Sequence, residues 1–270
     1  MKKVYFAYYA LILSIAGCVP GYAQNSTVVK SFIIDYWDSN QKVYRDSVCN
    51  LYFDFKNDKL ETLRLYPVYY DKSVTTAYLL FKNGNFANLA PFVQTLKSVK
   101  HRFEKWASDA RQNNVKDFSK SMEDKDLKIT SIGMFVTFKK GGEWYEVKSG
   151  SGSPLEGTPR PILDFTPYFW VDANGVPRVL MGFKEISGRR FEWDDNWAKS
   201  NMLKTVLVPE LAIKTFKETI SGGITLQFSS LTQIQSLIDA LEYYGVALEE
   251  IKAKQKAEKA KRDSISALFK

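Results

Sequence analysis

"GGITLQFSSLTQIQSLIDALEYYGVALEEI", residues 222–251, decides the fold, because it joins a short strand pattern to a long amphipathic helix pattern. The residues before Ser230 form the strand pattern. From Leu231 to Ile251, apolar residues recur at spacings of three and four, which predicts one apolar face on a helix. Ser230 and Gln233 form a capping box, a pattern typical of a helix start.

The same combination of strand and helix occurs 145 residues earlier in the chain. Leu79 and Phe81 of an earlier strand pattern match Ile224 and Leu226 at this offset. Eight apolar positions of an earlier helix pattern match eight in the later one: Phe86, Leu89, Phe92, Val93, Leu96, Val99, Phe103 and Trp106. Pro91 belongs in a first helical turn, so the earlier helix should begin near residue 88 or kink there.

A hairpin pattern precedes each strand-helix combination, but at a shift of 116 residues, from Tyr52-Phe53 to Tyr168-Phe169. The difference of 29 residues from the offset of 145 indicates an insertion near 184–212. These offsets favour a duplication with halves at 28–124 and 125–251. The alternative is that any two amphipathic helices can be aligned in this way.

The other apolar segments are short and alternate like strands, and several are joined by turn residues. Asn174-Gly175 supplies a tight hairpin turn within 167–183. The predicted strands lie at 28–37, 50–55, 60–70, 75–81, 128–138, 143–147, 167–183 and 222–228. The sequence therefore predicts an α+β protein with mainly antiparallel sheet, covered by two long amphipathic helices.

Residues 1–23 have the features of a secretory signal peptide: a basic start, an apolar stretch and small residues near its end. The segment before Cys18 resembles a lipobox, whereas the segment ending at Ala23 resembles an ordinary cleavage site. Its ending also resembles leaders of certain Gram-negative bacteria. We favour cleavage after Ala23, which predicts a soluble periplasmic or cell-surface protein over one that is lipid-anchored at Cys18. No transmembrane helix is expected after processing.

Cleavage after Ala23 leaves Cys49 as the only cysteine, and lipidation of Cys18 would leave Cys49 as the only free thiol. No internal disulfide is therefore expected in either case. We predict that Cys49 is a buried thiol on a strand. His101 is the only histidine, and the chain has no Gly-rich phosphate loop. The sequence therefore predicts neither a metal site nor a cofactor, and a non-enzymatic role is favoured.

Within "RRFEWDDNW" (189–197), Trp193 and Trp197 are four residues apart and flank Asp194 and Asp195. On a helix the two indoles would share one face, as a sugar-stacking platform requires. The carboxylates could bond sugar hydroxyls, but their spacing does not fit a calcium loop. The alternative is structural: the tryptophans pack on the core and the aspartates begin a helix.

The C-terminal tail, residues 252–270, is rich in lysine. Without Lys2 and Lys3 the formal charge falls from +8 to +6, and the tail accounts for nearly all of this excess. It could bind a glycan or an anionic envelope surface, or simply complement the helix dipole. Nucleic acid is not expected outside the cytoplasm. Ser264 lies in a sequence that resembles a bacterial O-glycosylation motif.

Together these features predict an exported binding or scaffold protein without enzymatic activity. The alternative is an envelope or polysaccharide hydrolase that uses carboxylates near the 184–212 insertion. The ligand, the oligomeric state and the processing site are left open by the sequence.

Overall fold

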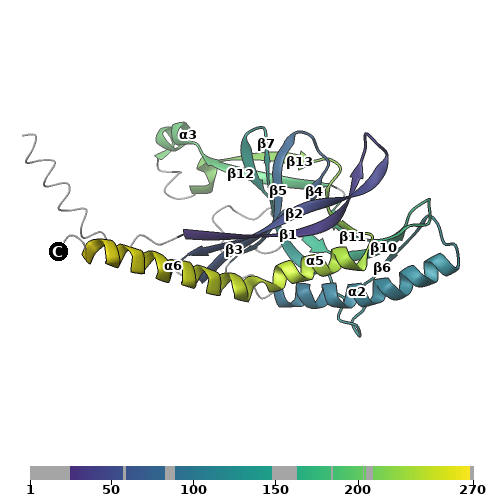
Figure 1. The fold of residues 1–270 in the computed structure, drawn as a ribbon. Coiled ribbons are helices and arrows are strands. Elements are labelled where there is room, and N and C mark those ends of the chain that lie inside the picture. Colours follow the sequence, from purple (N-terminus) through teal and green to yellow (C-terminus); the bar gives the residue numbers. More distant parts are fainter. Residues whose placement is uncertain are drawn as a thin grey trace, which may run out of the picture.

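The computed structural model of the 270-residue chain describes residues 25–56, 59–82, 89–147, 163–183, 185–202, 204 and 209–267. These residues form two antiparallel sheets and a pair of long helical segments (Figure 1). The predicted α+β class with antiparallel sheet is therefore confirmed.

The larger sheet has the strand order β1-β2-β3-β5-β7-β8-β12-β13, and β9 pairs with β7 off this path. Its first strands are β1 (Asn25–Asp38), β2 (Val43–Lys56), β3 (Lys59–Leu65) and β5 (Val74–Lys82). The remaining strands are β7 (Ile132–Lys140), β8 (Glu143–Glu146), β9 (Leu163–Phe165), β12 (Ile186–Trp193) and β13 (Ile213–Ile220). Alternation along these strands places Phe53, Leu63 and Leu79 on the buried inner face.

The smaller sheet has the strand order β4-β14-β11-β10-β6. Its strands are β4 (Val68–Tyr69), β14 (Ile224–Phe228), β11 (Pro177–Phe183), β10 (Pro167–Val171) and β6 (Phe118–Ser121). The predicted hairpin is formed by β10 and β11, and Gly175 in its turn has a φ of +80°. Glycine adopts this left-handed conformation without a steric penalty.

Two helices, α2 (Leu89–Gln112) and α5 (Leu231–Glu242), lie side by side along the smaller sheet (Figure 1). Pro91 falls in the first turn of α2, as predicted, and the capping box of Ser230 and Gln233 begins α5. The second predicted helix is not continuous, because it is interrupted at Tyr243 and continues as α6 (Tyr244–Ala267). Gly245 lies directly after the break, and glycine weakens helices.

The helices bury the residues that their periodicity predicts. Phe92, Leu96 and Phe103 of α2 are buried, as are Leu237 and Leu241 of α5. The side chain of Leu248 lies outside the described residues. These side chains belong to the same hydrophobic core as the inner face of both sheets.

Helix α5 also covers the free edge of β1 in the larger sheet. The backbone N–H of Ile33 donates to the Ser236 hydroxyl (2.9 Å), so this edge group is satisfied without another strand. Covering an edge strand in this way prevents it from pairing with other chains.

The two predicted halves share a local order of elements. In the first half, β2 and β5 both pair with β3, and α2 follows β5. In the second half, β10 and β14 both pair with β11, and α5 follows β14. The residue pair Phe53–Leu63 in the first hairpin corresponds to Phe169–Val179 in the second, at the predicted shift of 116. All four of these side chains are buried.

A buried ion cluster joins the two sheets. Arg178 of β11 donates through Nε to Asp35 of β1 (2.8 Å) and through Nη1 to Asp172, which follows β10. Burial by itself raises the pKa of Asp172, but hydrogen bonds from the Val176 N–H and Arg178 outweigh it and lower the pKa. The guanidinium also lies 3.8 Å from the ring centroid of Tyr44.

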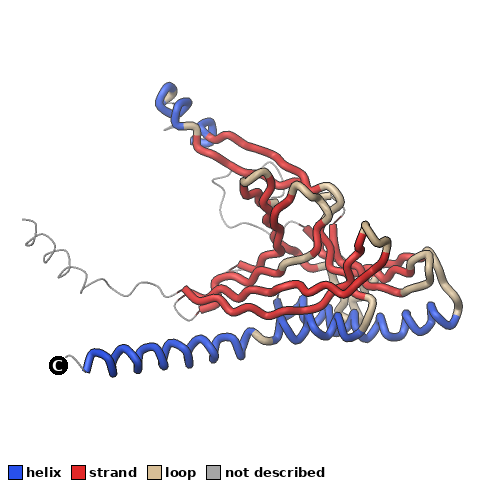
Figure 2. The backbone as a smooth tube through the Cα atoms, turned by 45° about the horizontal axis from the view of Figure 1, so that its top comes forward, coloured by secondary structure: helices blue, strands red, loops and turns tan. Residues whose placement is uncertain are grey.

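An arm that includes the described residues of 184–212, where an insertion was predicted, and continues to Ile220 reaches out from the body (Figure 2). It consists of β12 and β13, with helix α3 (Asp195–Ser200) and the 3₁₀ turn η3 (Pro209–Ala212) between them. Strands β12, β13, β6 and β9 were not predicted from the sequence, because they are short or carry charged residues on both faces. No described helix is long and apolar enough to span a membrane.

Beyond Ile251, helix α6 projects away from the body (Figure 1). Ile251 is buried, whereas every side chain from 252 to 265 that the structure describes is exposed. The predicted exposure of the lysine-rich tail is confirmed for this part.

Asp71 joins its own loop to the turn at Ser221 and to Lys140 at the end of β7, and its ionisation should make stability depend on pH. The Ser73 hydroxyl, with the backbone N–H groups of Ser221 and Ser73, holds the pKa of Asp71 well below its usual value. The stabilisation is therefore present above about pH 4 and is lost as the pH falls toward the lowered pKa. We expect Asp71→Asn to cost about 1–3 kcal/mol at pH 7. The difference from the unchanged protein should shrink at pH 3 in urea unfolding; a constant difference would contradict this role.

Candidate functional site

The residues singled out from the sequence lie on the arm, but they do not share one helix face. Trp193 is the last residue of β12, and its side chain is 49% exposed. Trp197 lies in α3 and is half-buried. The expectation of two indoles on one helical turn is therefore wrong, because the helix begins only after Asp194.

Asp194 has a structural role at this position. Its carboxylate caps α3 by accepting from the Trp197 N–H (3.1 Å), and it forms an ion pair with Lys214 (2.8 Å). The hydrogen bond from Lys214 and that from Trp197 lower the pKa of Asp194. Asp195 is exposed in the first turn of α3. Within the described residues, no group of three or more His, Cys, Asp or Glu side chains could hold a metal ion.

Cys49 lies in β2 opposite Phe32 of β1. Cys49 was predicted to be buried, and it is half-buried. Burial still raises the pKa of its thiol to about 12, so the thiol is protonated at neutral pH. Cys18 lies outside the described residues. Ser264 is exposed on α6, and its glycosylation stays a prediction.

A row of aromatic rings crosses the outer face of the larger sheet, opposite the core. Tyr52 and Tyr66 have ring centroids 5.0 Å apart, Tyr66 and Tyr78 5.5 Å, and Tyr78 and Trp144 5.6 Å. These four residues are called the aromatic row. Trp144 is 43% exposed, and the three tyrosines are partly exposed.

Arg64 lies within the aromatic row in a fixed orientation. Two of its N–H groups donate to the carboxylate of Asp54 at 2.7 and 2.8 Å, a bidentate geometry. Burial by itself raises the pKa of Asp54, but hydrogen bonds, first of all from Arg64, outweigh it and lower the pKa. The guanidinium carbon lies 5.2 Å from the Tyr52 ring centroid and 6.0 Å from that of Tyr78. A cationic hydrogen-bond donor is thus held between two aromatic rings.

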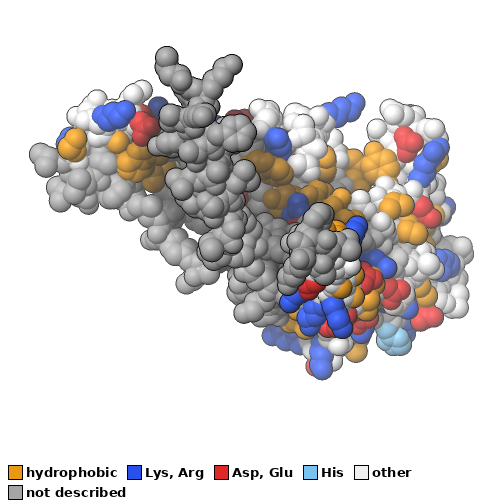
Figure 3. Space-filling view, turned by 60° about the vertical axis from the view of Figure 1, so that its left-hand side comes forward, with side chains coloured by type: hydrophobic (Ala, Val, Ile, Leu, Met, Phe, Trp, Pro, Cys, Tyr) orange, Lys and Arg blue, Asp and Glu red, His pale blue; other side chains and the backbone are white. Residues whose placement is uncertain are grey.

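An open pocket of about 370 Å³ continues the aromatic row toward the base of the arm. Cross-strand pairing of Tyr78 with Thr137, of Thr137 with Glu146 and of Glu146 with Arg189 places these side chains on one face. The pocket is lined by Tyr78, Thr137, Trp144, Glu146, Arg189, Arg190 and Phe191. Viewed from the end to which the arm points, hydrophobic side chains are visible between the arm and the rest of the body (Figure 3).

The aromatic row was not predicted from the sequence, because its members belong to four separate segments. Each is an aromatic residue at an outward position, next to inward residues such as Leu51 and Phe53. The sequence did contain one indication of this face: aromatic residues at strand positions where the alternation predicts polar, solvent-facing side chains. Their alignment depends on strand order, which periodicity does not provide.

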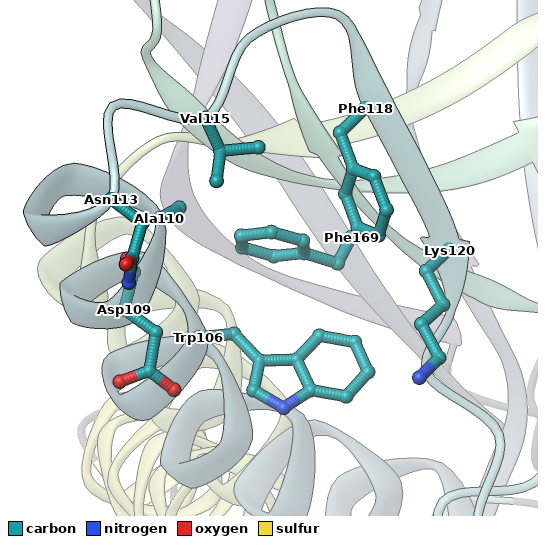
Figure 4. Close-up of a pocket in the computed structure, with 8 residues that line it drawn as sticks. All are labelled: Trp106, Asp109, Ala110, Asn113, Val115, Phe118, Lys120 and Phe169. Carbon is teal, nitrogen blue, oxygen red and sulfur yellow. The ribbon is translucent and has the colours of Figure 1, made fainter.

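A second open pocket of about 370 Å³ lies between the end of α2 and the edge strand β6 (Figure 4). The rings of Trp106, Phe118 and Phe169 surround it; Trp106 and Phe169 are 5.4 Å apart and nearly perpendicular. Periodicity had assigned Trp106 to the core-facing stripe of the helix. It is instead half-buried and lines this pocket.

The described architecture is thus an α+β protein of two antiparallel sheets with an aromatic outer face. Comparison of the chain with known protein families, with characterised proteins and with solved structures found no match.

Proposed function

We propose that this chain is an exported, non-enzymatic binding protein whose ligand is a glycan held on the aromatic row. The observation that carries the proposal is the spacing of four rings at 5.0–5.6 Å across neighbouring strands. The export signal of residues 1–23 gives the compartment in which such a ligand would be met.

The chemistry of the outer face suits a sugar chain. Each sugar ring has an apolar C–H surface that can stack on an aromatic side chain, and hydroxyl groups that need hydrogen-bond partners. Tyr78 and Trp144 offer the stacking surfaces, while Arg64 offers charged donors beside them. Three of the five N–H groups of Arg64 donate to Asp54 and Tyr66, which leaves donors for a ligand.

The face is also preorganised for binding. Arg64 is fixed by Asp54, and the carboxylate of Asp54 is in turn held by the hydroxyls of Thr27 (2.9 Å) and Thr62 (2.8 Å). Tyr52, Tyr78 and Trp144 lie on strands of the sheet. Tyr66 directly follows β3, and its backbone N–H donates to the Asn50 carbonyl of β2 (3.0 Å). A site that is ordered before binding loses less conformational entropy when the ligand arrives.

A screen of the purified protein against envelope and dietary glycans tests this proposal. Saturable binding of at least one glycan, without its turnover, is the expected result. Turnover that a single carboxylate substitution abolishes would instead support the hydrolase alternative. If no glycan in the screen binds, the glycan proposal is wrong.

The lysine-rich part of α6 supports a second contact of the same protein, with an anionic envelope surface. Its described side chains are exposed, and none of them from 252 to 265 packs into the core. An exposed basic helix is attracted electrostatically to a negatively charged surface, and added salt weakens this attraction.

We also infer that the two halves arose by duplication. Support comes from their shared element order and from the contact between the helices. Lys97 of α2 and Glu242 of α5 are 145 residues apart in sequence and form an ion pair of 2.5 Å. Equivalent residues that touch each other are expected at a pseudo-two-fold axis. Superposition of the halves tests this inference, and a mismatch in helix direction after superposition would refute it.

A further inference from the structure

We propose that the pocket between α2 and β6 binds a zwitterionic α-amino acid with an apolar side chain. This site is separate from the aromatic row and does not depend on the glycan proposal. The residues that carry it are Trp106, Asp109, Phe118, Lys120 and Phe169, all of which line the pocket (Figure 4).

The interior of the pocket is apolar and aromatic. Phe169 is buried and forms the base, with Phe118 at a centroid distance of 6.5 Å and Trp106 at 5.4 Å. The side chain of Phe118 is 42% exposed, so an apolar ligand would cover surface that water now contacts. Removal of such surface from water favours the complex.

Two opposite charges stand at the rim of the pocket. Figure 4 shows Asp109 and Lys120 on opposite sides of the Trp106 indole. The Lys120 ammonium lies 5.3 Å from the indole centroid. Among the residues that the structure describes, neither Asp109 nor Lys120 has an ion-pair partner. Each is therefore available to a charged group of a ligand.

The nearby cation Arg102 is already committed, in contrast to Lys120. Its guanidinium carbon lies 5.1 Å from the centroid of the same indole, and the guanidinium pairs with Asp124. It also donates to the Met122 carbonyl (3.0 Å). The pocket therefore offers one free ammonium and one free carboxylate among its described residues.

An apolar amino acid matches this arrangement. Its ammonium group would face Asp109, its carboxylate would face Lys120, and its side chain would lie against the rings of Phe118 and Phe169 that line the pocket. Both rim charges lie within one pocket of about 370 Å³, which suits a single residue. Within a longer peptide, neutral amide groups would replace one or both charges, so the free amino acid is the better match.

The test is a titration of the purified protein with L-phenylalanine, followed through the indole N–H signal of Trp106 in ¹⁵N-labelled protein. The signal that disappears in the Trp106→Phe variant is assigned to Trp106. We expect saturable shifts with L-phenylalanine. Affinity should fall at least fivefold for 3-phenylpropionate, which lacks the ammonium group, and for phenethylamine, which lacks the carboxylate.

Variants then assign the charges. Asp109→Asn should abolish the preference for L-phenylalanine over 3-phenylpropionate. Lys120→Gln should abolish the preference for L-phenylalanine over phenethylamine. Asp126→Asn, an exposed acid outside the pocket, is the matched control and should change neither. Equal affinity for the three compounds, an unchanged preference in Asp109→Asn, or no shift of the Trp106 signal would overturn the proposal. Trp144→Ala should leave this binding intact, which separates its outcome from that of the glycan site.

Discussion

Replacing Arg178 with methionine should destabilise the protein by about 3–5 kcal/mol in urea unfolding at pH 7. Arg178 and Asp35 each have side chains that are only 5% exposed, and Asp172 is 10% exposed. Without the guanidinium, two carboxylates would remain in the interior with no cation between them. A buried charge that loses its partner costs far more than the pair itself contributes.

The expected order of effects follows from the geometry. Asp35→Asn removes one carboxylate and leaves Arg178 paired with Asp172, so it should cost less than Arg178→Met. Arg45→Met is the matched control, since its ion pair with Asp38 spans 3.7 Å and its side chain is 52% exposed. Exposed pairs contribute about 0–1 kcal/mol. If Arg178→Met costs no more than Arg45→Met, the cluster does not join the sheets as described.

The second large effect is expected from Phe92→Ala, at about 3–5 kcal/mol. Phe92 is fully buried in α2, and its ring lies 5.9 Å from that of Phe81 in β5 and 6.2 Å from that of Phe165 in β9. The substitution opens a cavity between the helix and the larger sheet, and the rigid strands on its far side limit collapse.

Phe118→Ala is the control for this substitution, because the same atoms are removed from a residue that is 42% exposed. It should cost less than about 1 kcal/mol in the same unfolding experiment. Equal losses for the two variants would contradict the assignment of Phe92 to the core.

The sequence predicted the regular elements of this fold where one face is apolar. Phe92, Leu96 and Phe103 recur with the 3.6-residue period of a helix, which places them on one uncharged face, and this face is buried. The β10–β11 hairpin follows from its turn residues. The arm was not predicted, because four consecutive residues of β13, 214–217, are exposed, so the strand lacks the alternation that marks a half-buried strand.

The candidate site was harder to predict than the core. Trp193 and Trp197 were predicted to share a site because they are close in sequence. In the structure Trp193 ends strand β12, whereas Trp197 lies in helix α3, which begins after Asp194. Tyr52 and Trp144 are 92 residues apart and lie on one face only because β2, β3, β5, β7 and β8 are neighbours. Strand order results from long-range packing, and local residue patterns do not encode it.

The central claim is that the aromatic row is the ligand-binding face, and one comparison of variants tests it most directly. The dissociation constant of the glycan selected in the screen should be measured for Trp144→Ala and for Trp193→Ala. The two substitutions are chemically identical, and both indoles are partly exposed, at 43% and 49%. We predict that Trp144→Ala weakens binding by tenfold or more, or ~1.4 kcal/mol, whereas Trp193→Ala changes it by less than about twofold, within the scatter of surface substitutions. Loss of binding in Trp193→Ala with full binding in Trp144→Ala would contradict the account and place the site on the arm.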